Sequence, residues 1–160
     1  MTPQPDPDEL KRWHRRFGVE CNNQAWALAG KPGRSPDEDR DMLQQAFASA
    51  WHWSKAGTAL NGARADVTIA HVLSLLGHGS LALEHARRSL AYLEAHPAED
   101  WDLAFAHAEI AHAAAVLGDG ALHANHFALA KQLGAAIAED EDRQVFEAEL
   151  ARIPNKVNLS

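Results

Sequence analysis

Short breaks that contain glycine or proline divide most of this chain into segments about 16 to 18 residues long. The breaks lie at 31–36, 61–62, 77–79, 96–97, 118–120 and near 134. Between them, alanine and leucine recur at the three- and four-residue spacing of one helix face, and no stretch alternates apolar and polar residues as a strand does. The pattern therefore predicts an all-α fold of about seven helices joined by short turns.

Local signals place the ends of the first two helices. The first is expected to begin near Asp8 and to continue or resume through 23–30. A second helix is predicted to begin after Ser35, because Pro36 suits the first helical position and three acids follow it, facing the positive end of the helix dipole. Gly57 is expected to end it.

A chain of 160 residues suits one compact domain. We expect a disordered lead-in at 1–7, a single helical domain over 8–153 and a tail at 154–160. The last predicted helix, within 138–153, would cap the open end of the fold.

Charge and composition exclude several classes of partner. The net charge of −7 argues against nucleic acid and against an anionic membrane surface. No apolar run approaches the roughly 20 residues that span a bilayer. Cys21 is the only cysteine, so the chain can form no internal disulfide. A cytoplasmic location is the expectation that fits these features.

Two stretches of the chain resemble each other. Residues 70–90 read AHVLSLLGHGSLALEHARRSL, and residues 111–131 read AHAAAVLGDGALHANHFALAK. Both contain A-H, then L-G-x-G, then an alanine-rich second segment, and Gly77 and Gly118 lie 41 residues apart. Self-similarity at such a period is typical of proteins built from stacked helical hairpins.

These motifs resemble the tetratricopeptide repeat, and the pattern is also similar to that of uncharacterised bacterial proteins of this kind. The resemblance covers about 63–134 directly, and 8–57 as a degenerate first hairpin. It implies a right-handed stack of helix hairpins. The matching positions are Ala70, Leu73, Leu76, Gly77, Ala82, Ala86 and Ser89 in the first copy and Ala111, Ala114, Leu117, Gly118, Phe127 and Ala130 in the second.

The chain departs from that family's pattern in three ways. Its period exceeds the roughly 34 residues typical of the repeat. Glycine (Gly79 and Gly120) stands where an aromatic residue is expected after each turn, and His123 occupies a position that is usually alanine.

The resemblance implies a concave surface lined by the first helix of each hairpin. Arginine and histidine in such a groove would favour a partner that carries carboxylates, through charge-assisted hydrogen bonds. The alternative is a groove without a ligand, or one filled by the protein's own terminus. The expected groove residues are Arg64, His71, Ser74, Phe105 and His112.

A metal site is an alternative for the histidines, although none is favoured and no cofactor is expected. Glu109 and His112 form an E-x-x-H pair on one helix face, a spacing that occurs in pairs in di-metal helix bundles. His123 and His126 form a second pair across the turn. Because zinc needs three or four converging ligands, one such motif is a weak signal.

Residues 51–53, Trp-His-Trp, raise the question of whether His52 is a working residue. Its flanking tryptophans favour a packing role in which the imidazole finds a hydrogen-bond partner such as Asn61. A polar cluster of His52, Asn61 and Arg64 that binds a ligand is the alternative.

The sequence as a whole favours a non-enzymatic scaffold that binds a protein or peptide, and the groove residues named above would suit an acidic one. One alternative is a metal- or histidine-dependent enzyme with its site inside the helix stack. The other is a homodimer of structural role, with exposed aromatic residues such as Trp101 at its interface.

Overall fold

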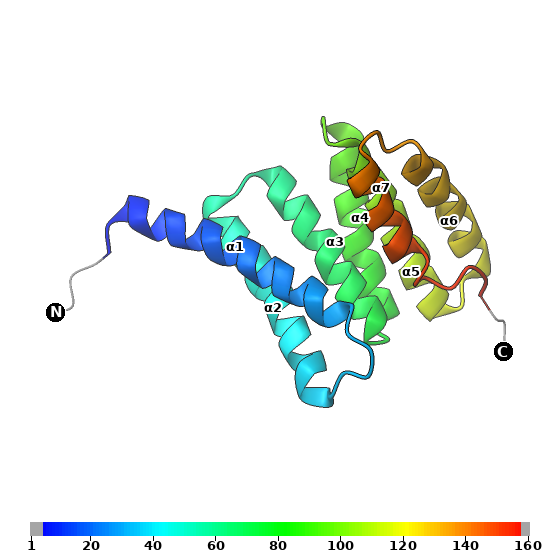
Figure 1. Ribbon diagram of the computed structural model, residues 1–160, viewed down its shortest axis with the longest axis horizontal. Helices are drawn as coiled ribbons and strands as arrows, with labels where there is room; N and C mark the ends of the chain where they lie inside the picture. Colours follow the sequence, from blue (N-terminus) through cyan, green and yellow to red (C-terminus); the bar gives the residue numbers. More distant parts are fainter. Residues whose placement is uncertain (1–4, 158–160) are drawn as a thin grey trace.

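A computed structural model describes residues 5–157, which fold into seven helices and no strand (Figure 1). The predicted all-α class is therefore confirmed. Residues 1–4 of the expected lead-in and 158–160 of the expected tail lie outside the described part of the chain. The helices are α1 (Pro7–Ala29), α2 (Pro36–Ala56), α3 (Ala59–Leu75), α4 (Gly79–Ala95), α5 (Asp100–Leu117), α6 (Gly120–Ala135) and α7 (Asp140–Leu150).

Capping residues explain where α2 and α3 begin. Ser35 accepts a hydrogen bond from the backbone of Glu38, whose side chain bonds back to Ser35, so the predicted start of α2 is confirmed. The break predicted at 61–62 is wrong. Thr58 caps α3 and the side chain of Asn61 completes the capping box, so the Asn-Gly pair lies within the first helical turns.

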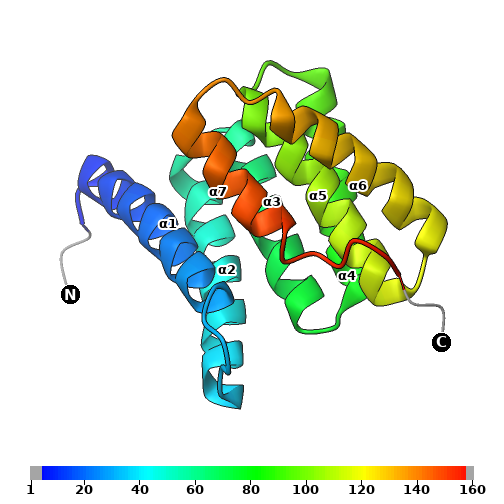
Figure 2. The same cartoon turned by 45° about the vertical axis from the view of Figure 1, so that its right-hand side comes forward.

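The first six helices form three hairpins, α1–α2, α3–α4 and α5–α6, that stack side by side. The first two hairpins contact each other through α2 and α3 and through α1 and α3, and the second and third through α4 and α5 and through α3 and α5. The N-terminal part of α1 extends away from the stack (Figure 1). Figure 2 shows α7 running alongside the last hairpin, where it contacts α5 and α6, as the predicted capping helix would.

The two similar sequence stretches adopt the same turn. Gly77 and Gly118 have positive φ angles of 81° and 74°, which a glycine adopts without strain. The following residues, His78 and Asp119, each donate a backbone hydrogen bond to the carbonyl five residues earlier, at 2.8 and 3.0 Å. The repeated L-G-x-G motif is thus a repeated helix–turn–helix geometry.

Helices α3 and α5 form the centre of the molecule. Eleven residues of each are buried, and many are alanine, which lets the neighbouring helices approach closely. Because α3 contacts α1, α2, α4 and α5, few positions on it face water. Polar residues on these two helices must therefore find partners inside the protein.

Candidate functional site

Two polar links join α3 to α5 at the same register. Arg64 bonds to Asp102 and His71 bonds to Glu109, and each pair is 38 residues apart in the sequence. The second pair lies seven positions further along both helices, which is roughly 10 Å along a helix axis. The candidate site therefore has two ends on one helix–helix interface.

The first end is a bidentate ion pair. Arg64 donates from Nε to Oδ1 and from Nη2 to Oδ2 of Asp102, both at 2.8 Å. The Asp102 side chain is 1% exposed, and its Oδ2 also accepts the backbone N–H of Glu99 at 3.0 Å. The guanidinium lies 4.4 Å from the ring centroid of Trp101. The hydrogen bonds to Asp102 raise the pKa of Arg64, so the guanidinium keeps its positive charge.

A cavity of ≈ 190 Å³ opens beside this ion pair. Three aromatic side chains contribute to its wall, and its polar groups come mostly from α1 and α3. The indole N–H of Trp26 donates to Thr68 Oγ1 at 3.0 Å, and that hydroxyl donates to Asn22 at 2.8 Å. These bonds fix the wall that α1 contributes. The lining residues are Asn22, Trp26, Arg64, Val67, Thr68, Trp101, Asp102 and Phe105.

The structure divides the five expected groove residues between the cavity and the interior. Arg64 and Phe105 line the cavity. His71, Ser74 and His112 are buried, with exposed fractions of 2%, 4% and 7%. These three residues therefore do not line an open groove. At His71 the cover is Trp26 of α1, which stacks on its ring at 4.4 Å between centroids.

The second end is a buried cluster of His71, Glu109 and His112. Nδ1 of His71 lies 2.9 Å from Glu109 Oε1, and Nδ1 of His112 lies 3.3 Å from Glu109 Oε2. One carboxylate thus joins two imidazoles, one from α3 and one from its own helix. Nε2 of His71 is buried and has no hydrogen-bond partner among the described residues.

Glu109 is ionised in this setting. Burial alone would raise the pKa of this carboxyl group, but the electrostatic interaction with His71 and the hydrogen bonds of both imidazoles outweigh it and lower the pKa to about 2. The carboxylate is completely enclosed, and its hydrogen bonds within 5–157 come from these two histidines.

The metal alternative of Glu109, His112, His123 and His126 does not form one cluster. Glu109 and His112 meet His71 instead. Nε2 of His123 bonds to the Pro154 carbonyl oxygen at 2.5 Å, and His126 lies 2.9 Å from His107, Nδ1 to Nδ1. The two histidines of α6 point to other neighbours, so the second i, i+3 pair is no ligand pair.

The possible polar cluster of His52, Asn61 and Arg64 is also not formed. His52 Nδ1 lies 2.8 Å from His14 Nδ1, and its ring packs against Phe17. Asn61 caps α3 and Arg64 bonds to Asp102. His52 is therefore a half-buried packing residue of the α1–α2 hairpin, with a partner other than the expected one. Burial, and then the neighbouring His14, lower its pKa.

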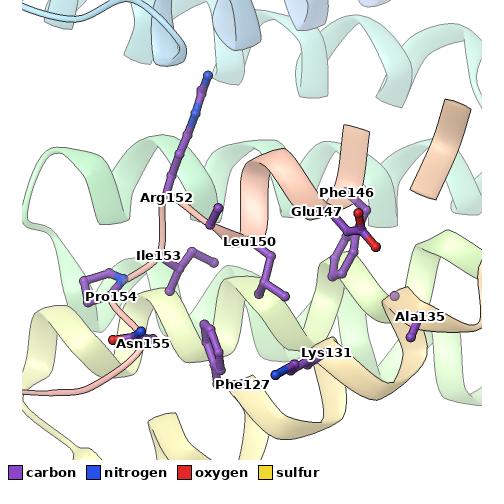
Figure 3. A pocket seen from close by; sticks show the side chains of 12 residues that line it. Phe127, Lys131, Ala135, Phe146, Glu147, Leu150, Arg152, Ile153, Pro154 and Asn155 are labelled. Atoms are coloured by element: carbon purple, nitrogen blue, oxygen red, sulfur yellow. The ribbon is translucent and has the colours of Figure 1, made fainter. Parts of the chain in front are cut away.

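A larger cavity of ≈ 780 Å³ lies between α6, α7 and the chain that follows α7 (Figure 3). Phe127, Phe146, Leu150 and Ile153 supply an apolar wall, whereas Arg152 points away from the other labelled side chains. The charged residues of its lining are all exposed. This cavity has neither a buried charge nor a buried histidine among its described lining residues, so it offers no comparable chemistry.

Sequence reasoning missed the carboxylates that neutralise the expected groove. No motif in the sequence marks Asp102. The sequence motifs group Glu109 with His112, His123 and His126, and not with His71. The sequence does contain a usable signal in its spacing. Arg64 and His71 are seven residues apart, and one hairpin later two acids, Asp102 and Glu109, have the same separation. The aromatic contribution of Trp26 had no such signal, because it depends on how α1 crosses α3.

None of the helices within 5–157 is both long and apolar enough to cross a membrane. Comparison of the chain with protein-family models, with curated proteins and with solved structures gives no match.

Proposed function

We propose that this protein is a non-enzymatic recognition module that takes up one apolar side chain of a protein or peptide partner in the cavity between α1, α3 and α5. The aromatic wall of that cavity is the observation that carries the proposal. Its ≈ 190 Å³ is below the roughly 300 Å³ at which small-molecule pockets begin, and matches a single side chain. The tetratricopeptide-like arrangement predicted from the sequence would serve the same role.

The charges at this site favour an apolar anchor over an acidic one. Arg64 is neutralised by Asp102, and the two groove histidines share Glu109. A partner carboxylate would have to compete with these internal carboxylates. Nη1 of Arg64 has no hydrogen-bond partner within 5–157, so it can donate to a backbone carbonyl beside the anchoring side chain.

Peptide selection tests the proposal. Peptides selected from a random phage-displayed library on the wild-type protein should share an apolar or aromatic anchor. Their affinity, measured by fluorescence polarisation, should fall at least about 30-fold on Trp101→Ala, the loss typical of a central interface aromatic. Phe47→Ala is the matched control, because Phe47 is an aromatic residue that is 40% exposed and lies outside the cavity. If the selected peptides bound Trp101→Ala with the same affinity as the wild type, this site would be refuted.

Self-association is a second candidate, supported by a different surface. Trp13, Phe17 and Trp51 on the α1–α2 hairpin are 44%, 39% and 54% exposed, and Trp13 stacks on Phe17 at 5.7 Å. Trp101, the aromatic expected at a dimer interface, is half-buried under Arg64 instead. Light scattering over a range of concentrations should give a mass above that of one chain, and Trp13→Ser should lower it. A constant monomer mass would exclude this candidate.

A further inference from the structure

The cluster of His71, Glu109 and His112 has the donor set and spacing of a metal site. One ligand atom from each residue lies within 4.8 Å of the other two. Zinc bonds to nitrogen and oxygen at about 2.0–2.1 Å, so two ligands at a tetrahedral angle lie roughly 3.3 Å apart. Nδ1 of His71 lies 2.9 Å from Oε1 of Glu109, and Nδ1 of His112 lies 3.3 Å from its Oε2, so each imidazole is within a few tenths of an ångström of that spacing from one carboxylate oxygen.

The charge of this cluster also favours a cation. A buried carboxylate needs a positive partner, since its desolvation is costly. The side chains that bond to Glu109 are imidazoles, which carry a positive charge only when they bind an extra proton. A divalent ion would supply a positive charge that does not depend on a proton.

The unpartnered nitrogen of His71 is the second observation that points to a ligand. Nε2 of this residue is buried and lacks a hydrogen-bond partner among the described residues, while the ring as a whole is 2% exposed. Buried polar atoms are nearly always paired. Within 5–157 the hydrogen bond to Glu109 is the one bond that this ring makes, so binding an ion at the cluster would break no other bond of His71.

We propose that His71, Glu109 and His112 together bind one divalent transition-metal ion of the Zn²⁺ class. Two imidazoles and one carboxylate are ligands that zinc accepts, and three protein ligands leave a fourth position open. Trp26, stacked on His71, covers the site and also forms part of the neighbouring cavity wall. Zinc binding at this cluster does not depend on peptide recognition in that cavity.

Zinc binding by the untagged wild-type protein is the first measurement. After chelator treatment and desalting, the protein should take up one Zn²⁺ per chain in isothermal titration calorimetry. The heat should depend on the buffer, because zinc displaces protons from the cluster. Co²⁺ in place of Zn²⁺ should give the visible absorption bands of a four-coordinate ion. If the chelator-treated, desalted protein bound neither Zn²⁺ nor Co²⁺, the proposal would be overturned.

Two variants locate the ion. Glu109→Gln and His112→Gln should each lower the apparent Zn²⁺ affinity by more than about 100-fold. Loss of a residue that only supports a ligand costs up to about 100-fold, and loss of a ligand itself should cost more. His123→Gln is the matched control, because His123 is an equally buried histidine that bonds to Pro154 instead. Circular dichroism verifies that each variant is folded. Unchanged zinc uptake by folded Glu109→Gln would place the ion elsewhere and refute the site.

Imidazole ¹⁵N spectra of the wild-type protein keep the test decisive if both variants fail to fold. Zinc should shift the ring nitrogens of His71 and His112. The alternatives are the pairs His14–His52 and His107–His126, whose signals can be identified from His14→Gln and His126→Gln. Shifts confined to either of these pairs would contradict binding at Glu109.

Discussion

The two ends of the α3–α5 interface use the same register but different chemistry. At one end Asp102 is held by the guanidinium of Arg64, a permanent cation with two parallel hydrogen bonds. At the other end Glu109 is held by His71 and His112, whose charge depends on a proton. The first end is a fixed cross-link. The second end has two imidazoles and a carboxylate but no permanent cation, so it is the proposed metal site, whereas the first end borders the proposed peptide cavity.

A third buried carboxylate follows the first pattern. Asp66 on α3 bonds to Arg88 and His85 of α4, so it has both a permanent cation and an imidazole. Burial acts to raise the pKa of Asp66, but Arg88 and then His85 outweigh it and lower the pKa below its ordinary value. Of these three buried carboxylates, Glu109 alone has no arginine partner.

The largest effect is expected when a fixed cross-link loses its cation. Arg64→Met keeps most of the side-chain volume against Trp101 but leaves Asp102 buried with no counter-charge. Breaking a buried pair in this way costs about 3 kcal/mol, the lower end of the usual range, because Arg64 is itself 31% exposed. Urea denaturation at pH 7 measures this difference in the free energy of unfolding.

The surface pair Arg40–Asp37 is the matched control for that experiment. Its side chains are 68% and 88% exposed, so Arg40→Met should change the free energy of unfolding by less than about 0.5 kcal/mol. If Arg64→Met were as mild as this control, the Asp102 link would contribute no more than a surface pair. The contrast between the two ends of the interface would then fail.

A smaller effect is expected at the titratable end. In metal-free buffer, Glu109→Gln removes the buried charge but keeps an amide that can bond to both imidazoles. We expect a loss of about 1–2 kcal/mol at pH 7, in the range for an impaired buried hydrogen bond, and less than the roughly 3 kcal/mol to which the lowered pKa of Glu109 corresponds, because the amide still bonds to the imidazoles. Equal losses for Arg64→Met and Glu109→Gln would mean that the two ends do not differ energetically.

The acid dependence of Glu109→Gln gives a second readout. The wild-type pKa of Glu109 is about 2 in the fold, below the ordinary 4.5, so its contribution to stability is present above pH 4.5. It is lost as the pH falls from 4.5 towards 2. The variant lacks this group, so its unfolding free energy should fall less steeply over that range. Parallel acid profiles for the two proteins would contradict an ionised Glu109.

Sequence reasoning predicted the helices and their stacking because those depend on local signals. Turn glycines such as Gly77 and Gly118, and caps such as Ser35, act within a few residues of their own position. The error at Asn61 was also local, since an Asn-Gly pair is typical of a turn but also tolerates the first turns of a capped helix. Hairpin stacking then follows from repeated apolar faces.

The partners of the site residues could not be predicted in the same way. Whether His112 meets His71 or His126 depends on which helix crosses α5 at that height, and neither spacing nor composition fixes that crossing. Trp26 shows the same limit, because an amphipathic helix pattern does not reveal that its indole will cover His71. Of the residues expected in one open groove, Arg64 and Phe105 line a cavity, and His71 and His112 form a buried cluster with Glu109.

The smallest effect is expected for a pair of imidazoles without a carboxylate bonded between them. Burial is the main cause that lowers the pKa of both His107 and His126. A neighbouring positive charge adds to this effect: His126 lowers the pKa of His107, and Arg87 lowers that of His126. Glu94 acts in the opposite direction on both. Because the folded pKa values lie below the ordinary 6.5, the contribution of the neutral pair is present above pH 6.5 and is lost as the pH falls below it.

The variant His126→Gln replaces one imidazole with an amide that can still bond to His107 but does not titrate. Thermal unfolding of wild type should occur at a lower temperature at pH 5.5 than at pH 7.5, and His126→Gln should reduce that difference. His78→Gln is the control, since His78 is exposed and its side chain does not cap α4. The reduction should be modest, because His52 also has a lowered pKa and contributes to the same acid dependence. If His126→Gln and His78→Gln behaved alike, the His107–His126 pair would contribute nothing measurable to the acid dependence of stability.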